Sequence, residues 1–319
     1  MAPLAPATGV PDAGNTRPDT PAGKPLRVRL AAYLALTKPR IIELLLVTTL
    51  PTMVVARRGL PALGLVLATL AGGALAAGGA NATNMFIDRD IDQVMHRTRK
   101  RPLVTGAVTP RAALTFAVGL EVAAFCELWA FVNLLSAVLA VSATAFYVFV
   151  YTLWLKRRSS QNIVIGGAAG AVPVLVGWAA VTGSLGWAPV VLFAIIFVWT
   201  PPHFWALAVR YADDYRSAEV PMLPVVASLR RTAREIVLYT ALLVAVSLVF
   251  AAVGSMGPIY TATAAATGLV YLAMSCRLWG RARSGRATGG DAMRLFGYSI
   301  TYLTVLFVAM AGDVLVRAR

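Results

Sequence analysis

The stretch NMFIDRDID, residues 84–92, places an amide and two carboxylates four residues apart at the end of a long apolar run. In a helix, steps of four keep Asn84, Asp88 and Asp92 on nearly one face, with a drift of about 40° per step. Two carboxylates held so close repel each other and require a cation. Mg²⁺ suits such oxygen ligands, and it usually takes one or two carboxylates together with phosphate oxygens of a substrate. The stretch therefore predicts a metal-bridged, phosphorylated substrate handled at a membrane surface.

The composition of the chain indicates an integral membrane protein. Of its 319 residues, 58% are hydrophobic and only 13% are charged, and the mean hydropathy is +0.71. These values are not those of a soluble protein core. Apolar runs of about 20 residues, long enough to cross a bilayer, recur along the chain. We predict an all-α membrane protein with nine transmembrane helices, at residues 41–57, 60–84, 112–131, 133–155, 161–181, 186–208, 235–254, 257–276 and 295–315.

The basic residues predict how these spans are threaded. With the N-terminus in the cytoplasm, nearly all Lys and Arg fall on the inside; the exceptions are Arg57, Arg58, Arg317 and Arg319. This asymmetry follows the positive-inside rule and predicts an N-in, C-out topology with an odd number of spans. The net charge of +15 is thus mostly a consequence of topology. No soluble basic domain is present that would favour a nucleic-acid partner.

The N-terminal segment differs from the rest of the chain. Residues 1–25 are rich in Ala, Pro, Gly, Thr and Asp and contain no apolar run, so they do not form a cleavable signal peptide. We predict a disordered cytoplasmic tail over residues 1–25 and a single nine-helix membrane domain over residues 26–319. The absence of transit-peptide features favours a bacterial inner membrane.

A second acidic cluster lies on the same predicted side as the first. The loop after the sixth span reads RYADDYRSAEVPMLPVV, residues 210–226. Asp213 and Asp214 are adjacent, so only one of them can face a given cavity. Asp214 shares a helix face with Arg210, so it either contributes to a second metal site or simply pairs with that arginine. The first cluster has its own cations close by, because Arg97 and Arg101 follow it directly and would suit a diphosphate.

Several of these motifs resemble a known family. The pattern N-x-x-x-D-x-x-x-D at residues 84–92, followed by M-x-R-T-x-x-R-P-L at residues 95–103, is similar to that of the UbiA-type intramembrane prenyltransferases. Three further stretches resemble the protohaem IX farnesyltransferases, the branch that makes haem O. They are LTKPRIIELLLVTT at 36–49, NIVIGGAAGAVPVLVGW at 162–178 and PPHFWALAVRYADDYRSAEVPMLPVV at 201–226. The resemblance runs from about Thr37 to the last span.

The resemblance implies a fold and a reaction. It implies a nine-helix bundle around a central cavity open to lipid, and transfer of farnesyl from farnesyl diphosphate to a vinyl group of haem b. Carried over by position, Asn84, Asp88 and Asp92 would hold one Mg²⁺ and Asp214 a second. Many relatives have D-x-x-x-D in the second loop, whereas this chain has Arg210 at the first position. The expected diphosphate-binding cations are Lys38, Arg97, Arg101, Lys156 and Arg157.

His203 has two interpretations. It stands inside an apolar span after Pro201 and Pro202, where a single histidine is often just a buried hydrogen-bonding group. With a haem substrate, contact with the iron or with a propionate becomes comparably reasonable, and we predict that His203 binds haem. Aromatic side chains are expected to line a dry cavity for the allylic cation; the candidates are Phe86, Tyr147, Tyr151, Trp199, Phe204 and Trp205.

Two other functions remain to be tested. A prenyltransferase of the same family could act on a quinone precursor such as 4-hydroxybenzoate, although an intact second D-x-x-x-D would have favoured that reading. A secondary transporter is the alternative from another class, but transporters tend to place ionisable groups near the bilayer midplane. Here they cluster at the predicted cytoplasmic mouth, where we expect the active site. An oxidase-assembly or haem-modifying protein is a further expected partner at the cytoplasmic loops.

Overall fold

A computed structural model describes residues 25–318, without the side chains of residue 41 and residues 43–46. Every regular element in this part of the chain is helical. The elements are α1 Leu26–Thr37, α2 Pro39–Arg57, α3 Leu63–Ile87, α4 Arg89–Val94, α5 Pro110–Phe131, α6 Leu134–Ala145, the π-helix η2 Phe146–Leu155, α7 Asn162–Thr182, α8 Trp187–Arg210, α9 Ala212–Ser217, α10 Leu223–Val226, α11 Leu229–Val253, α12 Pro258–Arg283 and α13 Gly289–Arg317. Apart from Pro25, the predicted tail lies outside the described residues.

The long helices match the predicted spans. Within the described residues, eight helices are long and apolar enough to cross a membrane, with α6 and η2 together forming one of them. The ninth predicted span, 41–57, coincides with α2 but is not among these eight. The all-helical membrane class is therefore confirmed, whereas the count of nine and the N-in orientation stay predictions. The run 112–131 does form a helix, α5, in spite of its two glutamates.

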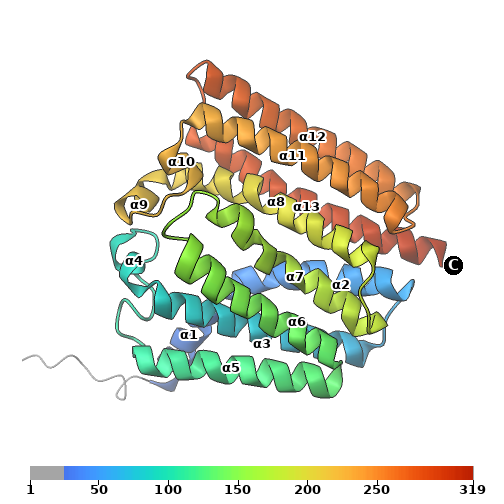
Figure 1. Ribbon diagram of the computed structural model, residues 1–319, viewed down its shortest axis with the longest axis horizontal. Helices are drawn as coiled ribbons and strands as arrows, with labels where there is room; N and C mark the ends of the chain where they lie inside the picture. The colour runs from blue at the N-terminus through green and yellow to red at the C-terminus, as the bar shows by residue number, and fades with distance from the viewer. Residues whose placement is uncertain (1–24, 319) are drawn as a thin grey trace, which may run out of the picture.

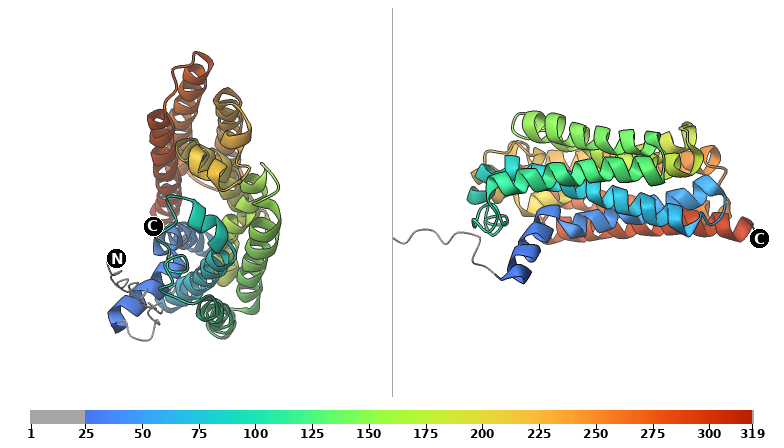
Figure 2. Two further views of the ribbon diagram at one scale, coloured as in Figure 1. Left: turned by 90° about the vertical axis from the view of Figure 1, so that its left-hand side faces the viewer. Right: turned by 90° about the horizontal axis from the view of Figure 1, so that it is seen from below.

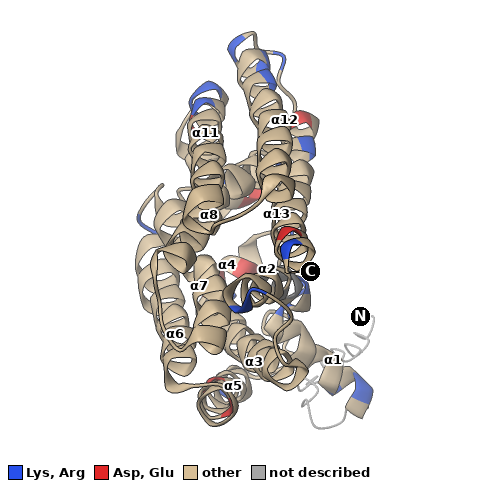
Figure 3. Cartoon of the chain, turned by 90° about the vertical axis from the view of Figure 1, so that its right-hand side faces the viewer, with Lys and Arg blue, Asp and Glu red and all other residues tan. Residues whose placement is uncertain are grey.

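The helices pack as an elongated bundle with two groups (Figure 1). Helices α2, α3, α5, α6 and α7 form one group, and α8, α11, α12 and α13 form the other. The groups meet where α7 packs on α8 and where α2 packs on α13 (Figure 3). The short helices α4, α9 and α10 lie together at one end, and α1 projects there at an angle to the bundle (Figure 2). The chain ends at the opposite end.

Small residues on α3 let α5 approach closely. A Cβ at Gly72 would lie 2.2 Å from Glu127 Oε2, and a Cβ at Gly79 would lie 2.6 Å from Glu121 Oε1. The two glycines are seven residues apart and so lie on the same helix face. Thr144 Oγ1 also donates to Glu121 Oε1 at 3.1 Å. The two acidic residues of α5 are thus accommodated by glycines of α3, which is close packing of the kind common in membranes.

The π-helix η2 shapes the wall of the bundle nearest α3. Thr152 Oγ1 donates to the carbonyl of Tyr147 at 2.8 Å, and the rings of Tyr147 and Tyr151 stack with centroids 5.3 Å apart. Tyr151 lies against Gly166 of α7, where an added Cβ would come within 2.2 Å of the ring. The π-helix is rare in proteins, and where it occurs it is often at a functional site. Thr152 of η2 contacts Asn84, and Lys156, which follows η2, contacts Asp88, so this end of η2 lies against the acidic end of α3.

Candidate active site

The predicted helical spacing of the first cluster is present in the structure. Helix α3 ends at Ile87 and α4 begins at Arg89, but backbone hydrogen bonds continue across the junction. The amide of Asp88 donates to the carbonyl of Asn84 at 2.9 Å, and the amide of Asp92 donates to that of Asp88 at 2.8 Å. All three side chains are buried, with Asp88 0% exposed. The break between α3 and α4 therefore preserves the step of four.

Each carboxylate of this cluster is paired with a cation from elsewhere in the chain. Lys156 Nζ donates to Asp88 Oδ2 in a short ion pair. Arg101 NH1 donates to both oxygens of Asp92, at 2.7 and 2.6 Å. Asn84 Nδ2 donates to Asp88 Oδ2 at 2.8 Å and lies 3.2 Å from Thr152 Oγ1. A compact polar network thus joins the end of α3 to the end of η2 and to the loop after α4.

Lys38 is the third cation of this network. Its Nζ donates to Asn84 Oδ1 at 2.8 Å. The residue has a positive φ of 53°, which non-glycine residues rarely adopt. The adjoining turn between α1 and α2 is held by Asn81, whose Nδ2 donates to the carbonyl of Thr37 at 3.1 Å. Burial, together with the neighbouring Arg101 and Lys156, lowers the pKa of Lys38 to about 7.

The donor set fits one divalent metal ion. Asp88 Oδ1 is buried and has no hydrogen-bond partner among the described residues, although Arg157 NH2 lies 3.9 Å away. A buried carboxylate oxygen without a hydrogen bond is costly unless a ligand completes it. No three His, Cys, Asp or Glu side chains in the described part of the chain lie close enough to hold a metal by themselves. Hard oxygen donors in this small number suit Mg²⁺ that shares its shell with phosphate oxygens.

The structure brings the second acidic loop to the first. Asp214 Oδ2 accepts a hydrogen bond from the backbone amide of Arg97 at 3.2 Å. The guanidinium of Arg97 lies over the ring of Tyr211, 5.5 Å from its centroid. No ion pair joins Arg210 to Asp214 among the described residues, so the simple i, i+4 pair is not formed. Asp214 instead ties the loop after α8 to the loop after α4.

Arg157 is engaged differently from the other predicted diphosphate-binding cations. It makes two hydrogen bonds to the carboxylate of Asp90, both at 2.7 Å. This pair lies at the surface, with side-chain exposures of 39% for Arg157 and 61% for Asp90. The same pair lowers the pKa of Asp90 to about 2. Asp90 is therefore ionised at neutral pH and holds Arg157 at the rim of the cluster.

His203 lies in the core between α8 and α13 and not in the acidic network. Its ring stacks on Trp199 and Phe296, with centroids 4.1 and 4.5 Å apart. Its Nδ1 lies 2.6 Å from Ser299 Oγ. Phe204, which follows it, contacts His203 edge-on and packs in the cluster that contains Tyr151. Phe204 and Tyr151 of the π-helix therefore pack against the same hydrophobic cluster.

Thr152 and Asn81 are site residues that the sequence patterns did not predict. Both contact the network: Thr152 lies within reach of Asn84, and Asn81 holds the turn that carries Lys38. Asn81 precedes Asn84 by three residues and so lies near it on α3, which is a signal that the pattern contained. Thr152 is a polar residue within the otherwise apolar and aromatic stretch FYVFVYTLWL, residues 146–155. A single threonine of this kind is too common in membrane helices to be selected from the sequence.

Comparisons with known proteins assign the chain to a family. The model of the UbiA prenyltransferase family matches residues 45–311. A protoheme IX farnesyltransferase from Paenarthrobacter aurescens is 55% identical over 285 residues, which are 89% of this chain and 89% of that protein. Another, from Streptomyces coelicolor, is 52% identical over 300 residues, 93% of this chain and 95% of that protein. The chain belongs to the UbiA prenyltransferase family.

Solved structures share the fold of this UbiA family member. Digeranylgeranylglyceryl phosphate synthase superposes with a TM-score of 0.74 at 15% identity, covering 90% of this chain and 98% of that chain. A UbiA homologue from Archaeoglobus fulgidus, bound to GPP and Mg²⁺, superposes with a TM-score of 0.62 at 17% identity, covering 88% of this chain and 99% of that chain. The predicted family, the predicted enzyme class and the multi-pass membrane character are confirmed.

Proposed function

We propose that this prenyltransferase moves a farnesyl group from farnesyl diphosphate to a vinyl group of haem b and so forms haem O. The observation that carries the proposal is the identity of more than half with curated protoheme IX farnesyltransferases over about nine-tenths of the chain. The buried network of Asn84, Asp88 and Lys156 supplies the chemistry that a diphosphate leaving group requires.

In the proposed reaction the bond between the allylic carbon and the diphosphate oxygen breaks, and the diphosphate leaves with the electron pair. The terminal vinyl carbon of haem b bonds to the allylic carbon. Water adds to the resulting benzylic-type cation and loses a proton, which leaves a hydroxyethylfarnesyl group. No side-chain nucleophile is required, which agrees with the absence of a Ser–His–Asp arrangement in the sequence.

The residues of the cluster would act by charge. Asn84, Asp88 and Asp92 would hold Mg²⁺, with Asp214 as the ligand of a second ion, and the bound metal would offset the charge on the departing diphosphate. Lys38, Arg101 and Lys156 already surround this position, so they can donate charge-assisted hydrogen bonds to phosphate oxygens. Arg97 and Arg157 are proposed to contact the diphosphate from the rim.

Haem b is proposed to contact His203. Ser299 has one hydroxyl hydrogen, and its Oγ donates to the carbonyl of Phe296 at 2.6 Å. Nδ1 of His203 must then carry the proton of its hydrogen bond to Ser299, which leaves the lone pair of Nε2 free. A neutral imidazole oriented in this way through its other nitrogen is the arrangement used by iron-ligating histidines.

The cellular setting is part of the proposal. The distribution of Lys and Arg supports an orientation with the N-terminus and the active site at the cytoplasmic face. The proposed membrane is a bacterial inner membrane. Residues 26–319 form the single membrane domain in this proposal. A haem-modifying or oxidase-assembly protein is the proposed partner, and the loops around α4 and α9 offer the polar surface for it.

The test is an assay of the purified protein in detergent with haem b, farnesyl diphosphate and Mg²⁺, read by mass spectrometry of the haem pool. We expect a hydroxyethylfarnesyl product that disappears with EDTA. Asp88→Asn should lower the rate by roughly 10²-fold or more, the size typical of losing one electrostatic group at the reacting centre. Asp213→Asn is the matched control, because the same change there affects an exposed ion pair with Arg216, which has no part in the proposed site.

Three results would contradict the proposal in different ways. Prenylation of 4-hydroxybenzoate with haem b unchanged would keep the family and replace the acceptor. Full activity of Asp88→Asn would remove the metal site from the cluster. If farnesyl diphosphate stayed intact with every acceptor tested, the result would favour the secondary transporter.

A further inference from the structure

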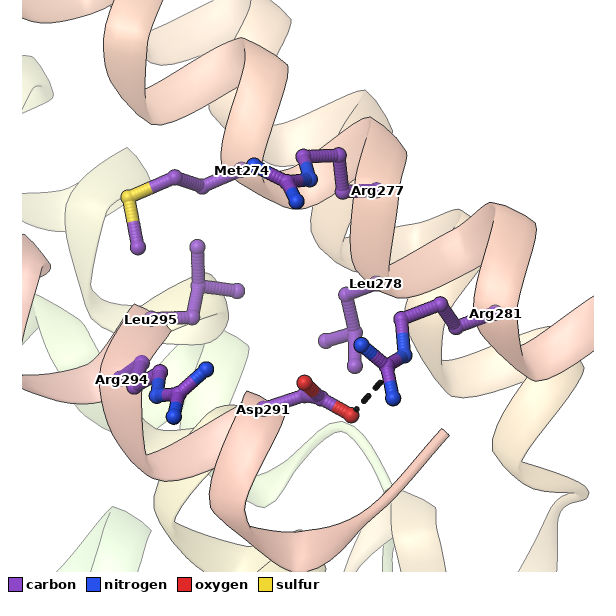
Figure 4. Close-up of a pocket in the computed structure, with 7 residues that line it drawn as sticks. All are labelled: Met274, Arg277, Leu278, Arg281, Asp291, Arg294 and Leu295. Carbon is purple, nitrogen blue, oxygen red and sulfur yellow. Dashed lines mark ion pairs between the residues drawn. The ribbon is translucent and has the colours of Figure 1, made fainter. Parts of the chain in front are cut away.

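A basic hollow lies between α12 and α13, outside the acidic network. It is a cavity of about 120 Å³, which is about four times the ~30 Å³ that a water molecule occupies in the liquid. Side chains of both helices point into it (Figure 4). They are Met274, Arg277, Leu278, Arg281, Asp291, Arg294 and Leu295. The site is large enough for a small anionic group.

The hollow contains three arginines and one carboxylate, and two of the arginines form no ion pair within the described residues. Asp291 Oδ2 lies 3.3 Å from Arg281 Nε, and the same carboxylate accepts from the amide and hydroxyl of Thr288, each at 2.9 Å. Asp291 therefore caps the N-terminus of α13 and forms an ion pair with Arg281. Arg277 and Arg294 have no ion pair or hydrogen bond with any described residue. Their guanidinium groups are available to bind an anion. Each guanidinium can donate two parallel hydrogen bonds, a geometry that suits the oxygens of a phosphate.

The apolar wall of the hollow indicates that the anion belongs to an amphiphile. Met274, Leu278 and Leu295 form this wall. Trp279 follows Leu278 in the last turns of α12, and the guanidinium of Arg283 lies over its ring, 5.3 Å from the centroid. Trp and Arg at the end of a membrane helix are typical of the headgroup level of a bilayer. A soluble phosphate would gain nothing from the apolar side, whereas a lipid would use both sides.

The surroundings of the hollow suit a lipid. The outer faces of α12 and α13 carry exposed apolar side chains that can contact acyl chains; they are Leu269, Val270, Val305 and Val308. The hollow lies at the end of the bundle that holds the second acidic loop, because a Cβ on Gly289 would lie 3.6 Å from Arg210 Cδ. Basic pockets between membrane helices at the cytoplasmic side bind anionic lipid headgroups. The hollow therefore combines a position at headgroup depth with a positive charge and an apolar wall, as an anionic lipid requires.

We infer that the hollow between α12 and α13 binds the phosphate headgroup of an anionic phospholipid, with Arg277 and Arg294 contacting the phosphate and Asp291 holding Arg281 in place. The shared chemistry is a phosphate, and the lipid is its source. This site is separate from the Asp88 network and does not depend on the proposed reaction.

The experiment is native mass spectrometry of the delipidated full chain with added phosphatidylglycerol or phosphatidylcholine. We expect retention of phosphatidylglycerol over phosphatidylcholine. Arg277→Gln together with Arg294→Gln should weaken that retention roughly 25-fold, about fivefold for each arginine near an anionic headgroup. Arg230→Gln with Arg231→Gln is the matched control, because it removes the same charge from two exposed residues of α11 that lie outside the hollow. The control should retain the lipid as the unaltered protein does.

Three results would overturn the inference. They are equal retention of the two lipids, equal loss in the control and the pocket variant, and complete displacement of the lipid by excess inorganic phosphate or diphosphate. The last would assign the hollow to a soluble anion. A second variant, Arg277→Lys with Arg294→Lys, guards against misfolding, because it keeps the charge and should bind more tightly than the Gln pair.

Discussion

The two carboxylate oxygens of Asp88 differ in their hydrogen bonding. Its Oδ2 accepts from Asn84 and Lys156, while Oδ1 has no hydrogen bond within the described residues. A buried carboxylate in this state depends on its cation, and removing that cation leaves an uncompensated charge. The same electrostatic need that suits a metal ion therefore makes Asp88 sensitive to its protein partner.

Lys156 and Arg157 should differ strongly although they are adjacent. Lys156→Ala removes the cation that is hydrogen-bonded to the buried Asp88 and should lower the free energy of unfolding by about 3 kcal/mol. Arg157→Ala breaks an exposed pair and should cost at most about 1 kcal/mol. Thermal unfolding in detergent measures both, and haem prenylation should fall far more in Lys156→Ala. Equal losses in the two variants would show that the burial of Asp88 does not control the site.

His203 should be visible in the haem spectrum if its Nε2 reaches iron. Ferric haem b bound to the protein should give a Soret shift that His203→Ala abolishes. Ser299→Ala removes the group that orients the ring and should weaken binding about 10- to 100-fold. An unchanged spectrum in His203→Ala would make this histidine a packing residue between Trp199 and Phe296.

At the scale of the element, the packing of α7 against η2 sets the position of the aromatic pair. Gly166 has no side chain where the ring of Tyr151 lies, and Tyr151 stacks on Tyr147. The preceding helices show the same device, because Gly72 and Gly79 leave room for the glutamates of α5. Glycine thus acts here through space and not through backbone freedom.

Gly166→Ala should therefore disturb the site from the neighbouring helix. Its Cβ would lie 2.2 Å from the Tyr151 ring, and overpacking of this kind costs about 1–3 kcal/mol. Gly170→Ala is the control, because nothing lies within 4 Å of its added Cβ and alanine is the better helix former. Unfolding and prenylation are measured for both. The same effect in the two variants would mean that only helix propensity changed.

At the scale of the whole molecule, one end of the bundle carries the candidate site and the other carries contacts that stabilise the helices. One end carries α4, α9 and the acidic network, whereas the other carries the α11–α12 turn and the end of α13 (Figure 1). Asp313 is fully buried at that far end and accepts from the amides of Gly257 and Ile259. It therefore caps the start of α12, while Arg58 donates to the carbonyl of Gly254 at 2.8 Å.

Asp313→Ala should separate stability from activity. It leaves the first amides of α12 without their acceptor and should cost roughly 2 kcal/mol. Prenylation measured well below the unfolding temperature should stay near that of the unaltered protein, because the acidic network lies at the other end. Loss of activity without loss of stability would contradict this division. Arg317→Gln removes an exposed cation that lies 3.7 Å from the carboxylate of Asp313 but keeps that carboxylate, so it should have the smaller effect on stability.

The sequence by itself determined the membrane class, the long helices and the grouping of Asn84, Asp88 and Asp92, because hydrophobicity and helical period are local properties. Only the tertiary structure decided which cation meets which oxygen. Lys156 reaches Asp88 across 68 residues, and His203 reaches Ser299 across 96. It also decided that Arg157 pairs with Asp90 and that two arginines of α12 and α13 remain unpaired. These contacts depend on how helices pack side by side, and a pattern along one helix contains no information about its neighbour.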